Sequence, residues 1–146
     1  MTLPAQPNAN FSHWSSIYAE GEDEAHRFKW IESEKARRDL GEVALHQWSQ
    51  DYWGSFTRYR WIEHLEGKRF FSELSADQFG LLCRPFTNHE ILLDRIMDRL
   101  RIGHENLEIY DWAVEWHIPC GPIHEILMVL KVNEARLPAP FEQMAC

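Results

Sequence analysis

The segment from residue 22 to residue 66 most constrains the fold, because it contains no proline and its apolar residues recur every three or four positions. This spacing places the apolar side chains on one face of a helix. A straight helix of this length would span about 67 Å, which exceeds the width of a compact domain of this size. Gly41 and Gly54 are the candidate breaks, since glycine costs about 1 kcal/mol inside a helix, and Gly67 is the expected end.

Prolines and glycines divide the rest of the chain into shorter segments. Capping boxes at residues 75–78 and 87–90 indicate the starts of two helices. Gly103 and Pro119 bound a third, and Pro122 suits the first turn of a last one. Residues 68–74 form the only arguable strand, which lacks a pairing partner. We therefore expect shorter helices over about residues 76–83, 87–102, 104–117 and 122–133.

These shorter helices carry apolar residues at helical spacing. Trp112 and Trp116 are four residues apart, so they are neighbours on one helix surface. The apolar set of the helix that ends near residue 102 is Ile91, Leu92, Ile96, Met97 and Leu100.

The sequence therefore predicts an all-α fold: an irregular helical bundle with a long N-terminal helical region broken at a glycine, and three to four shorter C-terminal helices. A length of 146 residues fits a single domain. We expect an N-terminal arm over residues 1–21, in which Pro4 and Pro7 oppose regular structure. A single helical domain follows over residues 22–137, and residues 138–146 form a C-terminal tail.

Charge and composition exclude several classes of partner and location. The chain has 15 Lys and Arg against 23 Asp and Glu, a formal net charge of -8, so we expect no duplex nucleic acid as a partner. No apolar run approaches the roughly 20 residues of a membrane span, so we expect no membrane association. The three cysteines form no Cys-x-x-Cys pair, and no secretory signal opens the chain. These features favour a cytoplasmic location with reduced thiols.

The chain is rich in tryptophan, with seven in 146 residues. Several can be explained by a Trp-rich core, yet Trp and Arg also concentrate binding energy at interfaces. A group of arginines flanks aromatic residues near the end of the long helical region, and Arg stacked on aromatic rings is a common interface element. The alternative is a solvated helix face with Arg stems lying over the rings. The predicted interface consists of Trp14, Trp53, Arg58, Arg60, Trp61, Phe70 and Phe71.

A short internal sequence repeat lies within the long helical region. The sequence Arg-Phe-Lys-Trp-Ile-Glu at residues 27–32 matches Arg-Tyr-Arg-Trp-Ile-Glu at residues 58–63. If a glycine breaks the helix between the copies, both could face a shared core or partner; coincidence is the alternative.

The best metal-binding pattern is His117-x-x-Cys120-x-x-x-His124. Imidazole and thiolate suit zinc or another borderline metal, and the turn at residues 119–122 could bring the three side chains together. The alternatives are a small buried Cys120 and a His117 that stabilises a helix C-terminus. A di-iron bundle site needs Glu-x-x-His pairs, which are absent.

No recognisable catalytic motif is present: the chain has no Gly-x-Ser-x-Gly elbow, phosphate loop or Cys-x-x-Cys-His. We therefore predict no catalytic residue and no cofactor. The sequence favours a non-catalytic protein-interaction module, an accessory subunit or assembly factor of a larger soluble complex, with a protein partner or a second copy. The alternative is a metal- or cofactor-binding helical protein, an oxidoreductase component that holds zinc or iron. A helix-turn-helix DNA regulator is a third hypothesis, weakened by few basic residues on its reading helix.

Overall fold

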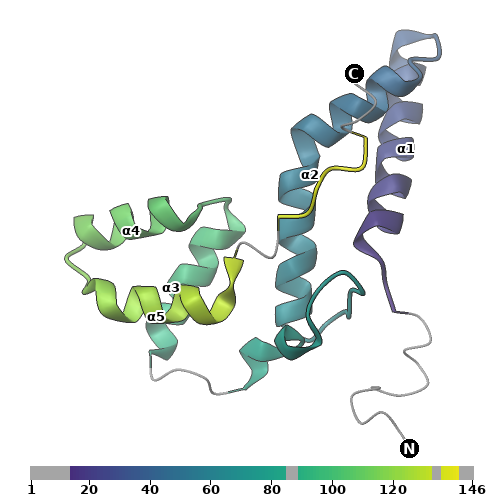
Figure 1. The fold of residues 1–146 in the computed structure, drawn as a ribbon. Coiled ribbons are helices and arrows are strands. Elements are labelled where there is room, and N and C mark those ends of the chain that lie inside the picture. Colours follow the sequence, from purple (N-terminus) through teal and green to yellow (C-terminus); the bar gives the residue numbers. More distant parts are fainter. Residues whose placement is uncertain (1–13, 85–88, 133–135, 142–146) are drawn as a thin grey trace, which may run out of the picture.

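The computed structural model describes residues 14–84, 89–132 and 136–141 (Figure 1). The described residues are mostly helical and contain no strand, which confirms the all-α prediction. Their single β-bridge joins Ser15 to Phe71, so residues 68–74 do not form the arguable strand. The elements in chain order are α1 (Ile17–Ala36), α2 (Glu42–Leu65), the short 3₁₀ helices η2 (Ala76–Gln78) and η3 (Leu81–Cys83), α3 (Glu90–Arg101), α4 (Asn106–Glu115) and α5 (Cys120–Leu130).

Helix α1 begins inside the segment that the sequence predicts as an arm, and its start is fixed by two side chains. The Ser16 hydroxyl accepts a hydrogen bond from the Ala19 N–H at 3.1 Å, as an N-cap does. The Glu73 carboxylate accepts hydrogen bonds from the Ser16 hydroxyl (2.6 Å) and the Ile17 N–H (2.7 Å). Burial raises the pKa of Glu73, but these hydrogen bonds outweigh it and lower the pKa below its usual value.

The backbone reverses direction between α1 and α2. Arg37 ends α1 with φ 58°, and Gly41 precedes α2 with φ 63°, so both residues lie in the left-handed region. Glycine adopts that region without steric cost. Gly54, by contrast, lies inside α2. The result is two adjacent helices that pack along each other (Figure 1).

The close approach of α1 to α2 depends on a glycine. Gly21 is buried, and a Cβ atom added there would lie 2.7 Å from the ring of Trp53 on α2. Trp53 cannot move aside easily, because its indole N–H donates to the Leu137 carbonyl at 2.6 Å. Gly54 has no atom within 4 Å of the same added position.

Replacing Gly21 with alanine is therefore expected to lower the free energy of unfolding by about 1–3 kcal/mol through overpacking. The matched change Gly54→Ala is expected to raise it by about 0.5–1 kcal/mol, since it only restores helix propensity. Urea unfolding of the two variants beside the wild type measures both changes. Two shifts of the same sign would contradict this account of the helix contact.

Helices α3, α4 and α5 form a group on the side of α2 away from α1 (Figure 1). Helix α3 contacts α2, and α4 contacts α5. The segment of residues 136–141 then returns along α2, and the Tyr18 hydroxyl of α1 donates to the Pro138 carbonyl at 2.7 Å. One hydrophobic cluster extends through these parts, and its fully buried large members include Ile17, Trp61, Leu65, Phe71, Ile96, Leu100, Ile109, Ile123, Ile126 and Leu130.

The shorter helices differ from their predicted bounds. The helix expected over residues 76–83 is two 3₁₀ turns, and the Ser75 hydroxyl accepts from the Asp77 N–H at 3.2 Å. The capping box at residues 87–90 lies partly outside the described residues. Helix α5 begins at Cys120 and ends at Leu130, earlier than expected at both ends. None of the described helices has the length and apolar content needed to cross a bilayer.

Candidate functional site

Three of the predicted interface residues lie in the core of the chain itself. Trp61 and Phe71 are fully buried, and Trp53 is 5% exposed. These three side chains are not on the surface, which corrects the predicted set. Helix α2 packs against α1 and also against α3, and all three side chains belong to one hydrophobic cluster.

The predicted arginine group is largely neutralised inside the chain. Arg60 lies 3.2 Å from Glu63 and 3.7 Å from Glu20, and its guanidinium lies over the ring of Phe56. Trp14 remains partly exposed and packs on Phe70 with ring centroids 4.7 Å apart. Nothing in the structure tests whether these residues meet a partner, so that part of the interface stays a prediction.

The predicted metal ligands do not form a site. Within the described parts of the chain, no group of three or more His, Cys, Asp or Glu side chains could hold a metal ion. His117 lies between α4 and α5 with φ 57°, and Cys120 is exposed at the start of α5. The His124 Nδ1 atom lies 3.0 Å from the Tyr110 hydroxyl. The spacing of the three residues was permissive, but the turn does not bring them together.

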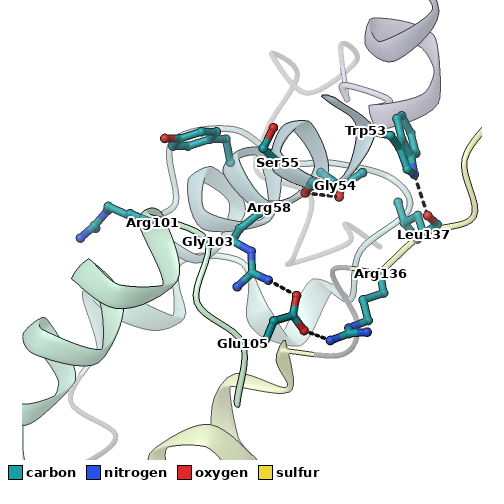
Figure 2. Close-up of a pocket in the computed structure, with 11 residues that line it drawn as sticks. Trp53, Gly54, Ser55, Arg58, Arg101, Gly103, Glu105, Arg136 and Leu137 are labelled. Carbon is teal, nitrogen blue, oxygen red and sulfur yellow. Dashed lines mark hydrogen bonds and ion pairs between the residues drawn. The ribbon is translucent and has the colours of Figure 1, made fainter. Parts of the chain in front are cut away.

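A cavity of about 500 Å³ lies where α2 meets the α3–α4 loop and the C-terminal segment (Figure 2). Arg58 donates to the His104 carbonyl at 3.0 Å and to Glu105 at 2.9 Å. Arg136 pairs with the same carboxylate from the other side. Burial lowers the pKa of Arg58, and the nearby Arg136 lowers it further.

The charges around this cavity are matched within the chain. Arg101 points away from the Glu105 cluster in Figure 2 and pairs with Glu66 at 2.9 Å. The Glu105 carboxylate forms ion pairs with both Arg58 and Arg136. We therefore interpret the cavity as a structural junction, which ties the start of α4 and the C-terminal segment to α2.

A second cavity, the α3–α4 groove, has a different character. Its volume is about 770 Å³, and it lies between α3, α4 and the residues just after α4. Three of its apolar side chains are largely exposed: Ile91 (76%), Ile102 (69%) and Trp116 (66%). Single exposed apolar residues are ordinary, but a contiguous group in one cavity indicates a binding site. The residues that line the groove are Ile91, Leu92, Arg95, Asp98, Arg99, Ile102, Trp112, Trp116 and Ile118.

The groove also holds two arginines without a carboxylate partner. No ion pair of Arg95 or Arg99 occurs among the residues that the structure describes. The Arg99 guanidinium lies over the Trp112 ring, 4.8 Å from its centroid. Asp98, the one acid in the lining, lies 3.3 Å from Arg101. The groove is thus largely apolar, and its two arginines have no carboxylate within ion-pair distance among the described residues.

Sequence reasoning missed this groove because it grouped Ile91 with the other apolar residues of this helix and did not separate exposed from buried positions. The structure shows that Ile91 is exposed, while Ile96, Met97 and Leu100 form the buried face of α3. Two sequence features point to the groove: Arg95 and Arg99 are four residues apart, and so are Trp112 and Trp116. What the sequence could not show is that the two pairs line one cavity.

Comparison with known proteins identifies no matching family model, no matching curated protein and no matching solved structure.

Proposed function

We propose that this chain is a non-catalytic protein-interaction module, an accessory subunit or assembly factor that docks a partner protein in the α3–α4 groove. The observation that carries the proposal is the joint exposure of Ile91, Ile102 and Trp116 in one cavity. Apolar surface left in water costs about 25 cal/mol per Å². A partner that covers these side chains recovers that free energy.

The chemistry of the groove is that of a protein-binding hot spot. Trp and Arg are the residue types that most often dominate interface energies, and the groove contains two of each. The Arg99 guanidinium lies over the Trp112 ring, and Trp116, which lines the same groove, is largely exposed. A groove between two helices suits an inserted helix, which presents apolar residues along one face.

The function is tested by crosslinking from the groove. A photoreactive phenylalanine derivative at position 116 is expected to crosslink a partner protein in cells. The same residue at position 30, where Trp30 is 65% exposed on α1, is the matched control and is expected not to crosslink that protein. The partner is then purified, and its affinity for the wild-type chain is measured by calorimetry.

Truncation of a hot-spot tryptophan costs about 2 kcal/mol or more, so Trp116→Ala is expected to weaken binding at least roughly thirtyfold. Trp30→Ala should leave the affinity unchanged, and both variants should keep the helical far-UV signal. Equal crosslinking from both positions, crosslinking only to a second copy of the chain, or equal affinities of the two variants would contradict the proposal.

A further inference from the structure

Arg95 and Arg99 of the α3–α4 groove have no carboxylate partner among the described residues, although the chain carries a net charge of -8. Arg37, Arg38 and Arg84 also lack a carboxylate partner within the described residues, but none of them lines the groove. The arginines that do pair with carboxylates are Arg27, Arg58, Arg60, Arg69, Arg101 and Arg136. Arg95 and Arg99 are therefore the two arginines that lack a carboxylate partner among the described residues and also lie among the apolar side chains of the groove.

Both arginines lie on the same face of α3 as the exposed apolar residues. Arg95 is four positions after Ile91, Arg99 is four positions after Arg95, and Ile102 is three positions further. Residues three and four apart are neighbours on a helix surface. This row extends for about 16 Å along the axis of α3, or about three helical turns. A partner helix of similar length could contact the whole row.

We infer that the groove binds an acidic amphipathic helix of another protein, whose apolar face covers Ile91, Ile102 and Trp116 and whose flanking carboxylates pair with Arg95 and Arg99. This inference rests on the proposed function and specifies the partner segment. Guanidinium groups bind carboxylates through two parallel hydrogen bonds, which fix the register as well as the position of the partner. Apolar burial then supplies affinity, and the arginines select the charge of the segment.

Charge also distinguishes this occupant from a second copy of the chain. A symmetric dimer through the groove would place the same surface against itself. Such an interface would hold four arginines from the lining against two copies of Asp98, and an excess of like charge at an interface opposes association. An acidic helix meets the same surface with opposite charge.

The test is a selection from a displayed library of helical peptides of about three turns. Leucines are fixed along one face, and the flanking positions vary among Glu, Lys, Gln and Ser. The targets are the full-length wild-type chain, the exposed-site variant Arg95→Glu, the double variant Arg95→Glu/Arg99→Glu, and the control Arg38→Glu. Arg38 is a matched control because it is exposed and lacks a carboxylate partner in the described residues, but lies in the α1–α2 turn.

Against the wild type and Arg38→Glu, we expect Glu to be enriched over Lys by up to about fivefold for each contacting position. Against the double variant the preference should reverse to Lys, and Arg95→Glu alone should weaken it. Higher salt should reduce the enrichment. Peptides that bind without a charge preference, but are lost with Trp116→Ala, would overturn this inference and leave the proposed function intact. If no selected peptide depends on Trp116, both fail.

Discussion

Replacing Trp61 with alanine is expected to lower the free energy of unfolding by about 3–5 kcal/mol. Trp61 is fully buried, and it belongs to the cluster that joins α1, α2 and the C-terminal helices. Removing its side chain leaves a cavity that neighbours on both sides of α2 would have to fill. The stability of a domain of this size is about 5–15 kcal/mol, so this loss is a large fraction of it.

Two further substitutions make the Trp61 experiment specific. Trp61→Phe keeps a ring and removes an indole N–H that has no hydrogen-bond partner among the described residues, so its cost should be clearly smaller. Trp30→Ala on exposed α1 surface should change stability by less than about 0.5 kcal/mol. Urea unfolding followed by far-UV circular dichroism measures all three. Equal losses for Trp61→Ala and Trp30→Ala would contradict the burial of Trp61.

Because Trp61 is buried, a mutation at this position reports on the stability of the fold and not on binding alone. Trp53, Arg60 and Trp61 belong to the interface predicted from the sequence, and on that prediction alone their replacement would weaken assembly and leave the helical signal intact. The burial of the two tryptophans implies that their loss destabilises the fold itself. Position 116 is the informative one for binding, because it can change without loss of core packing.

The helical class was predictable from the sequence, because apolar spacing and the positions of proline and glycine are local properties. The residue at which α1 begins was not predictable in this way. It depends on Glu73, whose carboxylate binds the Ile17 N–H across 56 positions of sequence. The spacing of Trp14, Ile17 and Tyr18 suits only a short turn of helix, so the long helical segment was expected to begin at residue 22.

The short sequence repeat of residues 27–32 and 58–63 shows why the site was harder to predict than the fold. Trp30 and Trp61 occupy the same place in two nearly identical six-residue segments, yet one is largely exposed and the other is fully buried. Helix α1 has a neighbour on one side, whereas α2 has neighbours on both (Figure 1). Burial is set by this tertiary environment, so local sequence could not tell a core tryptophan from a surface one.

Replacement of His64 is the second substitution for which we expect a large loss of folding stability. Its ring is fully buried on α2, and its Nε2 atom lies 2.7 Å from the Ser75 carbonyl oxygen. On the other side, its Nδ1 atom accepts a hydrogen bond from the Phe71 N–H at 3.2 Å. This arrangement requires a neutral ring with its proton on Nε2. His64 thus satisfies two backbone groups of the loop that follows α2.

Replacing His64 with leucine is expected to lower the free energy of unfolding by about 1.5–4.5 kcal/mol. Leucine fills much of the space but leaves the Phe71 N–H without its partner, at about 1–3 kcal/mol. The Ser75 carbonyl loses one of two hydrogen bonds, at about 0.5–1.5 kcal/mol, because the Gln78 N–H still donates to it at 3.1 Å. Urea unfolding at pH 7.5 measures the loss. A change below about 1 kcal/mol would mean that water or other groups replace both hydrogen bonds.

The pH dependence of stability separates this role from simple packing. Burial lowers the pKa of His64 below its ordinary value of 6.5, against the opposing effect of the hydrogen bond to Ser75. Above pH 6.5 the ring is neutral in both the folded and unfolded chain, so its contribution is fully present. Below that pH the unfolded chain binds a proton that the folded chain does not, and stability falls until the folded pKa is reached.

We therefore expect the wild-type chain to lose more stability than His64→Leu as the pH falls from about 7.5 to about 5.5. The other histidines and the carboxylates are common to both proteins, so the difference between the two profiles isolates His64. Urea midpoints at steps of half a pH unit measure it. Parallel profiles would show that His64 has the same pKa in the folded and unfolded chain, and that a neutral, doubly hydrogen-bonded ring does not hold the loop to α2.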